Sequence, residues 1–196
     1  MFLFCIMPTD QKARKECCNK AILDEQWLSL IAQNDRQAFE KLYRATDKTL
    51  FAYILSILRN TEDAQDVMQD TYLKIRASAH LYTPQGKPLA WILTIAKNLS
   101  FMKLREQTRK RTYSFEETLT EAIYLDDITN NEDTIILKAA LTTLNDTERQ
   151  IILLHAISGL KHHEIADILH IPLSTSLSKY HRALAKLKKQ IEKEVC

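Results

Sequence analysis

The side chains best suited to recognition chemistry lie near the C-terminal end of the chain, where hydroxyl and cationic groups are dense. The segment 164–189 reads EIADILHIPLSTSLSKYHRALAKLKK. Hydroxyl, imidazole, ammonium and guanidinium groups are the ones that proteins place against base edges and phosphates. At the start of the second half of this segment, the residues that carry such groups are Ser174, Thr175, Ser178, Lys179, His181 and Arg182. These residue types indicate a nucleic-acid-binding surface, and an ordinary solvated helix face is the alternative.

A short helix, a tight turn and a longer helix must position these side chains. KHHEIADILH predicts the first helix, Ile171-Pro172 the turn, and the residues from Leu173 onwards the final helix. Pro172 fits near the start of a helix because its φ is fixed and it has no N–H to satisfy. This order predicts a helix-turn-helix, in which the second helix enters the major groove of DNA.

Leu177 can be placed in two ways on this final helix. It shares a heptad-like seam of apolar residues that would form the core face. The seam consists of Leu173, Leu177, Tyr180, Leu184, Leu187 and Ile191. Leu177 also lies among the polar recognition residues, so it either packs in the core or points at the groove, and the sequence leaves both open.

Charge is distributed in three blocks, although the net charge of the 196-residue chain is only +2. Residues 97–111 hold six basic side chains against one Glu, and residues 113–133 hold seven acidic side chains and no Lys or Arg. Residues 179–193 hold six basic side chains against one Glu. Such separation indicates a polyanion-binding surface on each of two modules, with an acidic tether between them.

The composition predicts an all-α chain of two small helical domains. Only two glycines and four prolines are present, which favours long helices over sandwiches and barrels. Thr61 is expected to cap a helix, Asn145 and Glu148 to form a capping box, and Gly159 to end a helix in a left-handed conformation. The expected parts are a disordered extension 1–23, a helical domain 24–111, a flexible acidic linker 112–133 and a helix-turn-helix domain 134–196.

Several other classes of function are disfavoured. His155, His162, His163 and His170 have no Cys or carboxylate at ligand spacing, so we expect no metal, and no other cofactor is indicated. The chain has no phosphate-cradling glycine loop and no nucleophile motif, so we expect no enzyme. Cys5, Cys17, Cys18 and Cys196 lie near the chain ends and are expected to be free thiols. No run is long and apolar enough for membrane insertion, and we expect a cytoplasmic protein.

Four blocks, in this order, resemble bacterial RNA polymerase sigma factors of the extracytoplasmic-function (ECF) group of the sigma-70 family. AFEKLYRATDKTLFAYILSIL is similar to the opening helices of their promoter-melting domain, and NTEDAQDVMQDTYLKI to the acidic helix that contacts polymerase. PLAWILTIAKNLSFMKLR is similar to the helix that reads the minus-ten element. The segment 141–189 is similar to the domain that reads the minus-thirty-five element. The resemblance covers about residues 39–189.

The resemblance implies partners and residue roles. Core RNA polymerase, through its β′ clamp helices and β flap, would be one partner, and the β′ clamp helices would bind Asp63, Asp66, Gln69 and Asp70. Asn98 would contact a base of the minus-ten element, and Lys97, Lys103, Arg105 and Arg109 would contact phosphates. The loop Tyr82–Lys87 occupies the base-pocket position, whereas Trp91 is expected to be a core aromatic. Promoter DNA is the second partner, and an anti-sigma factor is a further partner of such proteins.

The recognition helix departs from the pattern of the family it resembles. Where relatives commonly have Gly-Thr-Val-Lys-Ser-Arg, this chain has Ser174-Thr175-Ser176-Leu177-Ser178-Lys179. Leu177 thus replaces a cation, which should weaken phosphate binding, and a leucine could instead touch a thymine methyl. The expected function is a sigma factor that binds core polymerase, directs it to promoters and assists melting. The alternative is a stand-alone helix-turn-helix regulator, which would not need the acidic helix beside a basic one.

Overall fold

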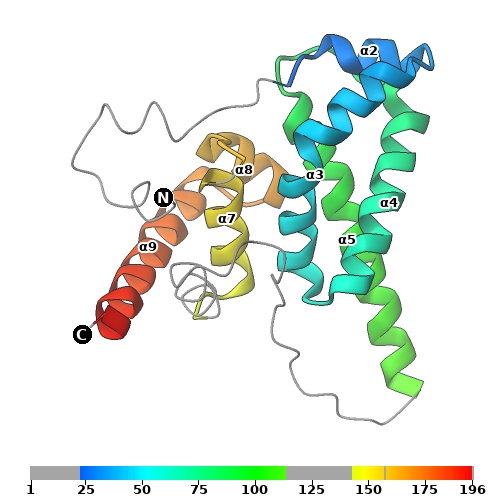
Figure 1. Cartoon of the computed structure of the whole chain (residues 1–196). Helices are drawn as coiled ribbons and strands as arrows, with labels where there is room; N and C mark the ends of the chain where they lie inside the picture. The colour runs from blue at the N-terminus through cyan, green and yellow to red at the C-terminus, as the bar shows by residue number, and fades with distance from the viewer. Residues whose placement is uncertain (1–22, 114–142, 157, 196) are drawn as a thin grey trace. The chain divides into compact units, whose positions relative to one another are not determined.

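The structure is a computed structural model that describes residues 23–113 and 143–195, except Ile157, and the side chains within 23–109 and 143–190. The described residues are helical, without strands, and fall into two compact units, 23–113 and 143–195 (Figure 1). This confirms the predicted all-α class. Residues 1–22 of the predicted extension 1–23, residues 114–133 of the predicted linker 112–133 and all four cysteines lie outside the described residues. The predicted domain boundaries stay predictions.

The first unit packs four helices around one core. They are α2 (Gln26–Ala32), α3 (Arg36–Leu58), α4 (Thr61–Ser78) and α5 (Pro88–Tyr113), with the short 3-10 helix η2 (Ala79–Leu81) before the loop to α5. Helix α5 continues past the predicted boundary at 111. The core of the first unit is formed by side chains such as Leu28, Leu42, Leu50, Ile54, Ile75, Ile92 and Leu93, each at most 1% exposed. Helices α3, α4 and α5 all contact one another. The side of each helix that turns away from these contacts is exposed to solvent.

Local sequence sets the ends of these helices. Asp35 caps α3, since its Oδ1 accepts hydrogen bonds from the backbone N–H groups of Gln37 and Ala38. Helix α3 ends at Arg59, which is left-handed (φ 57°) and donates its N–H to Leu55. The prediction that Thr61 caps α4 is wrong by one residue. Asn60 is the cap, because its extended backbone lets Oδ1 accept from the N–H of Asp63 at 2.9 Å.

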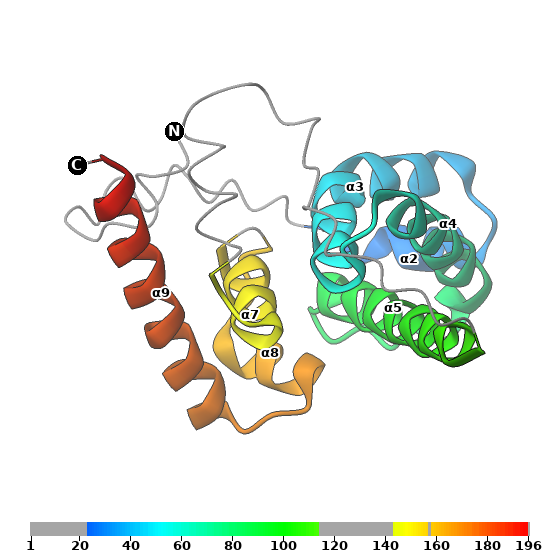
Figure 2. The ribbon, with the colours of Figure 1, turned by 90° about the horizontal axis from the view of Figure 1, so that it is seen from below.

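The second unit is a three-helix arrangement that contains the predicted helix-turn-helix. It consists of α7 (Asp146–Ala156), α8 (His162–Leu169) and the long α9 (Leu173–Val195), and both α7 and α8 pack on α9 (Figure 2). The capping box is confirmed, since Asn145 and Glu148 exchange hydrogen bonds of 2.9 and 3.2 Å. Gly159 is left-handed as predicted (φ 64°).

A partly buried ion pair fastens α9 to α7. The Nζ of Lys186 lies 2.7 Å from Oε2 of Glu148, whose side chain is only 3% exposed. Burial by itself raises the pKa of Glu148, but the hydrogen bonds from Lys186 and the Asn145 backbone outweigh it and hold that pKa below its ordinary value. The recognition helix is therefore fixed to the unit at its middle, downstream of its recognition residues.

Candidate nucleic-acid and protein interfaces

Helix α4 presents an acidic face to the outside. Asp66, Gln69 and Asp70 are exposed, and Leu73, one turn further on, is 65% exposed. Their spacing of three, four and seven residues places them on one side of the helix. We call these four residues the acidic face. The sequence analysis missed Leu73, although its spacing from Asp66, Gln69 and Asp70 could have revealed it, and its exposed side chain adds one apolar group to this charged face.

Asp63 is separated from the acidic face by its contacts with α5. Its side chain is 22% exposed, with Oδ1 3.1 Å from Nζ of Lys103 and Oδ2 accepting a 2.6 Å hydrogen bond from Gln107. Lys103 also lies 3.5 Å from Oδ2 of Asp66, and its hydrogen bond to Asp63 raises the pKa of Lys103. Asp63, which was predicted to contact polymerase, thus binds Lys103, which was predicted to contact DNA. This pair joins α4 to α5.

Helix α5 presents a second exposed surface, of a different character. Asn98, Arg105 and Arg109 are exposed, and Phe101 between them is 38% exposed. We call Asn98, Phe101, Arg105 and Arg109 the reading face, because an amide, an aromatic ring and two guanidinium groups suit a base and its phosphates. The sequence analysis singled out the amide and the cations but missed Phe101.

Lys97 does not belong to this surface. It is 6% exposed, and burial lowers the pKa of its ammonium group. A phosphate contact requires a side chain that reaches solvent, so this placement contradicts the predicted phosphate role of Lys97. The neighbour Asn98 points outward because successive helical residues are about 100° apart.

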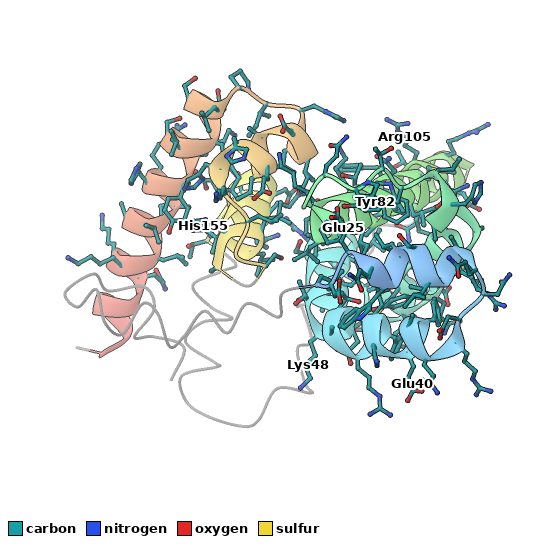
Figure 3. The ribbon with its side chains drawn as sticks, turned by 90° about the horizontal axis from the view of Figure 1, so that it is seen from above. Glu25, Glu40, Lys48, Tyr82, Arg105 and His155 are labelled. Carbon is teal, nitrogen blue, oxygen red and sulfur yellow. The ribbon has the colours of Figure 1, made fainter. Side chains whose placement is uncertain are left out.

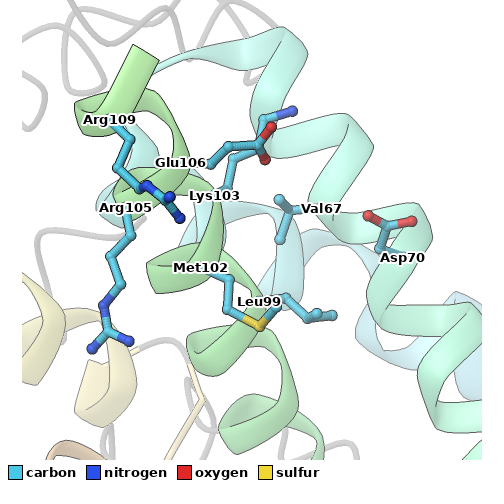
Figure 4. A pocket seen from close by; sticks show the side chains of 8 residues that line it. All are labelled: Val67, Asp70, Leu99, Met102, Lys103, Arg105, Glu106 and Arg109. Atoms are coloured by element: carbon cyan, nitrogen blue, oxygen red, sulfur yellow. The ribbon is translucent and has the colours of Figure 1, made fainter. Parts of the chain in front are cut away.

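An open groove lies between the two faces. It has a volume of about 610 Å³ and is lined on the α4 side by Val67 and Asp70 (Figure 4). The α5 side contributes Leu99, Met102, Lys103, Arg105, Glu106 and Arg109. The groove therefore combines apolar side chains, including the 62% exposed Met102, with carboxylates on both helices and cationic groups on α5.

The recognition helix α9 places most of its predicted residues outside. Ser174, Leu177, Ser178, His181 and Arg182 are exposed, whereas Thr175 and Lys179 are half-buried. The exposed five lie at a helical spacing of three and four, so they form one stripe, which we call the recognition stripe. Arg182 donates from Nε to the backbone oxygen of Ser178 at 3.3 Å.

Leu177 is 37% exposed, which resolves the choice between core and groove in favour of the outside. The residues that do face α7 and α8 include small ones, because Ser176 and Ala183 are both fully buried. Tyr180, Leu184 and Leu187 complete this inner face. The heptad seam therefore faces inward at those three residues, whereas Leu173 and Leu177 are exposed and the side chain of Ile191 lies outside the described residues.

Comparison with known protein families relates both units to the same family. Residues 42–110 match the family described as Sigma-70 region 2, and residues 134–187 match Sigma-70, region 4. The chain belongs to the sigma-70 family, in its ECF group. It is a sigma factor, which directs RNA polymerase to promoters. The alternative of a stand-alone regulator is not favoured, because the first unit matches region 2.

Relatives of known name are similar over most of this sigma factor. The ECF RNA polymerase sigma factor SigK of Mycolicibacterium vanbaalenii is 27% identical, covering 83% of this chain and 86% of its own length. The RNA polymerase sigma factor CarQ of Myxococcus xanthus is 28% identical, covering 82% and 94%. A solved structure of the sigma factor RpoE from Bartonella quintana, in complex with the anti-sigma factor NepR, has a TM-score of 0.69 at 23% identity. It covers 79% of this chain and 96% of that one, and this likeness confirms the fold.

The loop before α5 of this sigma factor is held by a residue that the sequence analysis missed. Oε1 of Glu25 accepts hydrogen bonds from the hydroxyl of Tyr82 and from the N–H groups of Gln85 (2.8 Å) and Gly86 (2.7 Å) (Figure 3). These bonds, led by that from Tyr82, hold the pKa of Glu25 below its ordinary value, although partial burial opposes them. Trp91 is half-buried, and its ring meets that of Tyr82 edge to face at 5.3 Å.

We expect the Glu25→Ala substitution to release this loop while the helices stay folded. Two backbone N–H groups lose a charged acceptor, so amide hydrogen exchange at Gln85 and Gly86 should rise about tenfold. Hydrogen–deuterium exchange of peptides that span the loop measures this. Glu40→Ala is the matched control, because Glu40 is exposed and forms its ion pair with the exposed Arg44 on the same helix. Equal exchange in the two variants would contradict the anchoring role.

Two histidines and a tyrosine gather in the region 4 unit beside the recognition stripe. The rings of His155 and His162 stack at 4.6 Å, and both meet the ring of Tyr180 at 4.8 and 4.7 Å. Oγ of the buried Ser176 lies 3.5 Å from Nδ1 of His162. Burial, and then the nearby His155 and His181, lower the pKa of His162. Within the described ranges no three His, Cys, Asp or Glu side chains are grouped so that they could hold a metal ion.

The region 4 unit should lose stability in acid. Because the pKa of His162 is lower in the folded chain than its ordinary 6.5, the unfolded chain takes up this proton first as the pH falls. The contribution of neutral His162 to the free energy of unfolding is complete above pH 6.5, and it declines as the pH falls from there through the lowered pKa of the folded chain. Hydrogen exchange of α8 and α9 in the full chain, corrected for its intrinsic pH dependence, measures this. The decline should shrink in His162→Phe and persist in the control His163→Phe, at an exposed position.

Proposed function

We propose that this sigma factor binds core RNA polymerase through the acidic face of α4 and contacts promoter DNA through the reading face of α5 and the recognition stripe of α9. The observation that carries the proposal is the pairing of two unlike surfaces on adjoining helices of one unit. The acidic face offers Asp66, Gln69 and Asp70 with Leu73, whereas α5 offers an amide, an aromatic ring and two cations. A protein partner and a nucleic acid can therefore be held side by side.

The acidic face suits a basic helical partner such as the clamp helices of the polymerase β′ subunit. Asp66 and Asp70 supply the charge that complements a basic partner, while Leu73 supplies an apolar contact. Asp63 is left out of this set, because Lys103 and Gln107 occupy its carboxylate. It acts instead by holding α4 and α5 together.

On the DNA side, Asn98 reads a minus-ten base, with Phe101 available for stacking and Arg105 and Arg109 for phosphates. Lys97 takes no part, since it is buried. The loop Tyr82–Lys87, anchored by Glu25, holds a base that leaves the stack when the duplex opens. The recognition stripe contacts the minus-thirty-five element. Nucleotidyl transfer belongs to the polymerase, so the protein needs no catalysis of its own. It works in the cytoplasm, together with the polymerase.

An anti-sigma factor is a further proposed partner. The sigma factor RpoE of Bartonella quintana, which shares this fold, has been solved in complex with the anti-sigma factor NepR. The acidic face would be the surface to cover, because a protein bound there would block polymerase directly.

The deciding experiment adds the purified chain to core RNA polymerase on a set of genomic fragments. Run-off transcripts that start at discrete positions, and that require the chain, are the expected result. A stand-alone regulator would instead retard DNA by itself and would leave core polymerase without specific transcripts. That second outcome would overturn the proposed function.

A further inference from the structure

Two leucines at the start of α9 remain uncovered in the region 4 unit. Leu173 is 47% exposed and Leu177 is 37% exposed, one helical turn apart. Residues four apart on a helix are neighbours, so the two side chains form one apolar ridge. The ridge stands out because the inner side of the same helical turns is occupied by the small, fully buried Ser176.

The surroundings of this ridge are polar and cationic. Ser174 and Ser178 flank Leu177 on the recognition stripe, and His181 and Arg182 follow one turn later. A protein-binding patch usually has a broader apolar centre, whereas a narrow apolar ridge among hydroxyl and guanidinium groups matches the edge of a DNA base beside its phosphates. The charge complementarity of this end of α9 therefore favours duplex DNA as the occupant.

One group in the major groove is complementary to a leucine. Thymine carries a 5-methyl group there, which the edges of adenine, guanine and cytosine lack. We propose that Leu177, supported by Leu173, selects a thymine in the upstream promoter element by contact with this methyl group. The inference rests on the proposed function, and it assigns a base preference at the position where the relatives that this chain resembles commonly have a cation.

The test isolates the methyl group from the rest of the base. An upstream element is first selected from a randomised promoter library with the reconstituted holoenzyme. Each thymine is then replaced singly by uracil, which keeps the O4 acceptor and removes only the methyl. At one thymine we expect promoter binding to fall about three- to fourfold, the loss expected for one buried methyl group.

The leucine must account for that loss. In the Leu177→Ala holoenzyme the same replacement should cost nothing further, and in Leu177→Arg the selected base should shift from thymine towards guanine. Leu30→Ala is the matched control, because Leu30 is 39% exposed on α2 and lies outside the proposed interfaces. This control should keep the full sensitivity to uracil. Circular dichroism verifies that each variant is folded.

The outcomes separate this inference from the proposed function. If the holoenzyme starts transcripts at promoters but no thymine is selected, or uracil is tolerated equally with and without Leu177, the inference is wrong and the function stands. If Leu177→Ala weakens binding to core polymerase in the absence of DNA, the ridge binds protein and the inference is also wrong. If no promoter-specific transcript forms at all, the proposed function itself fails.

Discussion

Replacing Asp66 and Asp70 together by lysine abolishes binding to core RNA polymerase. Both carboxylates are exposed on the acidic face, so the fold does not depend on their burial. The double substitution changes the local charge by four units and puts like charges opposite a basic partner helix, which costs several kcal/mol. We expect the dissociation constant to rise at least about a hundredfold. Co-elution with sigma-free polymerase at moderate salt, followed by titration, measures it.

The control must carry the same charge change elsewhere. Glu40→Lys with Asp167→Lys fits, because both positions are exposed and neither lies on the acidic face. The new ammonium group at position 66 would also face Lys103, so circular dichroism and thermal unfolding must show an intact region 2 unit. Unchanged binding by a folded Asp66→Lys, Asp70→Lys variant would show that the acidic face is ordinary solvated surface.

The sequence predicted the helices better than it predicted which of their faces are covered. Scarcity of glycine and proline was enough for the all-α class, and the capping box at Asn145 and Glu148 depends on residues three apart, which a sequence shows directly. The cap of α4 was misplaced because Asn60 and Thr61 are both good caps and only the backbone conformation selects Asn60.

The differences between the expected and the observed surroundings of these site residues share a cause, which is tertiary packing. Helical spacing puts Asp63 near Asp66 and Lys97 beside Asn98, but the packing of α5 on the rest of the unit decides that Asp63 is paired and that Lys97 is buried. The same holds for Leu177, whose placement the sequence left open between core and groove and which is 37% exposed in the folded unit. Contacts across long separations, such as Glu25 with the loop at Gln85, leave no local signal at all.

Asn98→Ala impairs promoter opening more than initial promoter binding. Asn98 is exposed on α5 one turn from Phe101, so its amide can hold a base that has left the duplex. Closed complexes form through phosphates and the recognition stripe, which the substitution leaves intact. A lost amide–base contact of about 1–3 kcal/mol predicts a decrease in open complexes of roughly tenfold. Permanganate reactivity of unpaired thymines reports opening, and filter binding at low temperature reports the closed complex.

Two comparisons make this result specific to base capture. Gln37→Ala removes an exposed amide from α3 of the same unit and should change neither step. Arg105→Ala should weaken both steps alike and reduce their salt dependence, because a phosphate contact is made before and after melting. On a template with a pre-melted bubble, Asn98→Ala should lose its discrimination among bases at one non-template position, since the amide distinguishes the bases by its hydrogen bonds. Equal losses in the closed and open complexes would instead assign Asn98 to duplex binding, with capture of the flipped base left to the loop that Glu25 anchors.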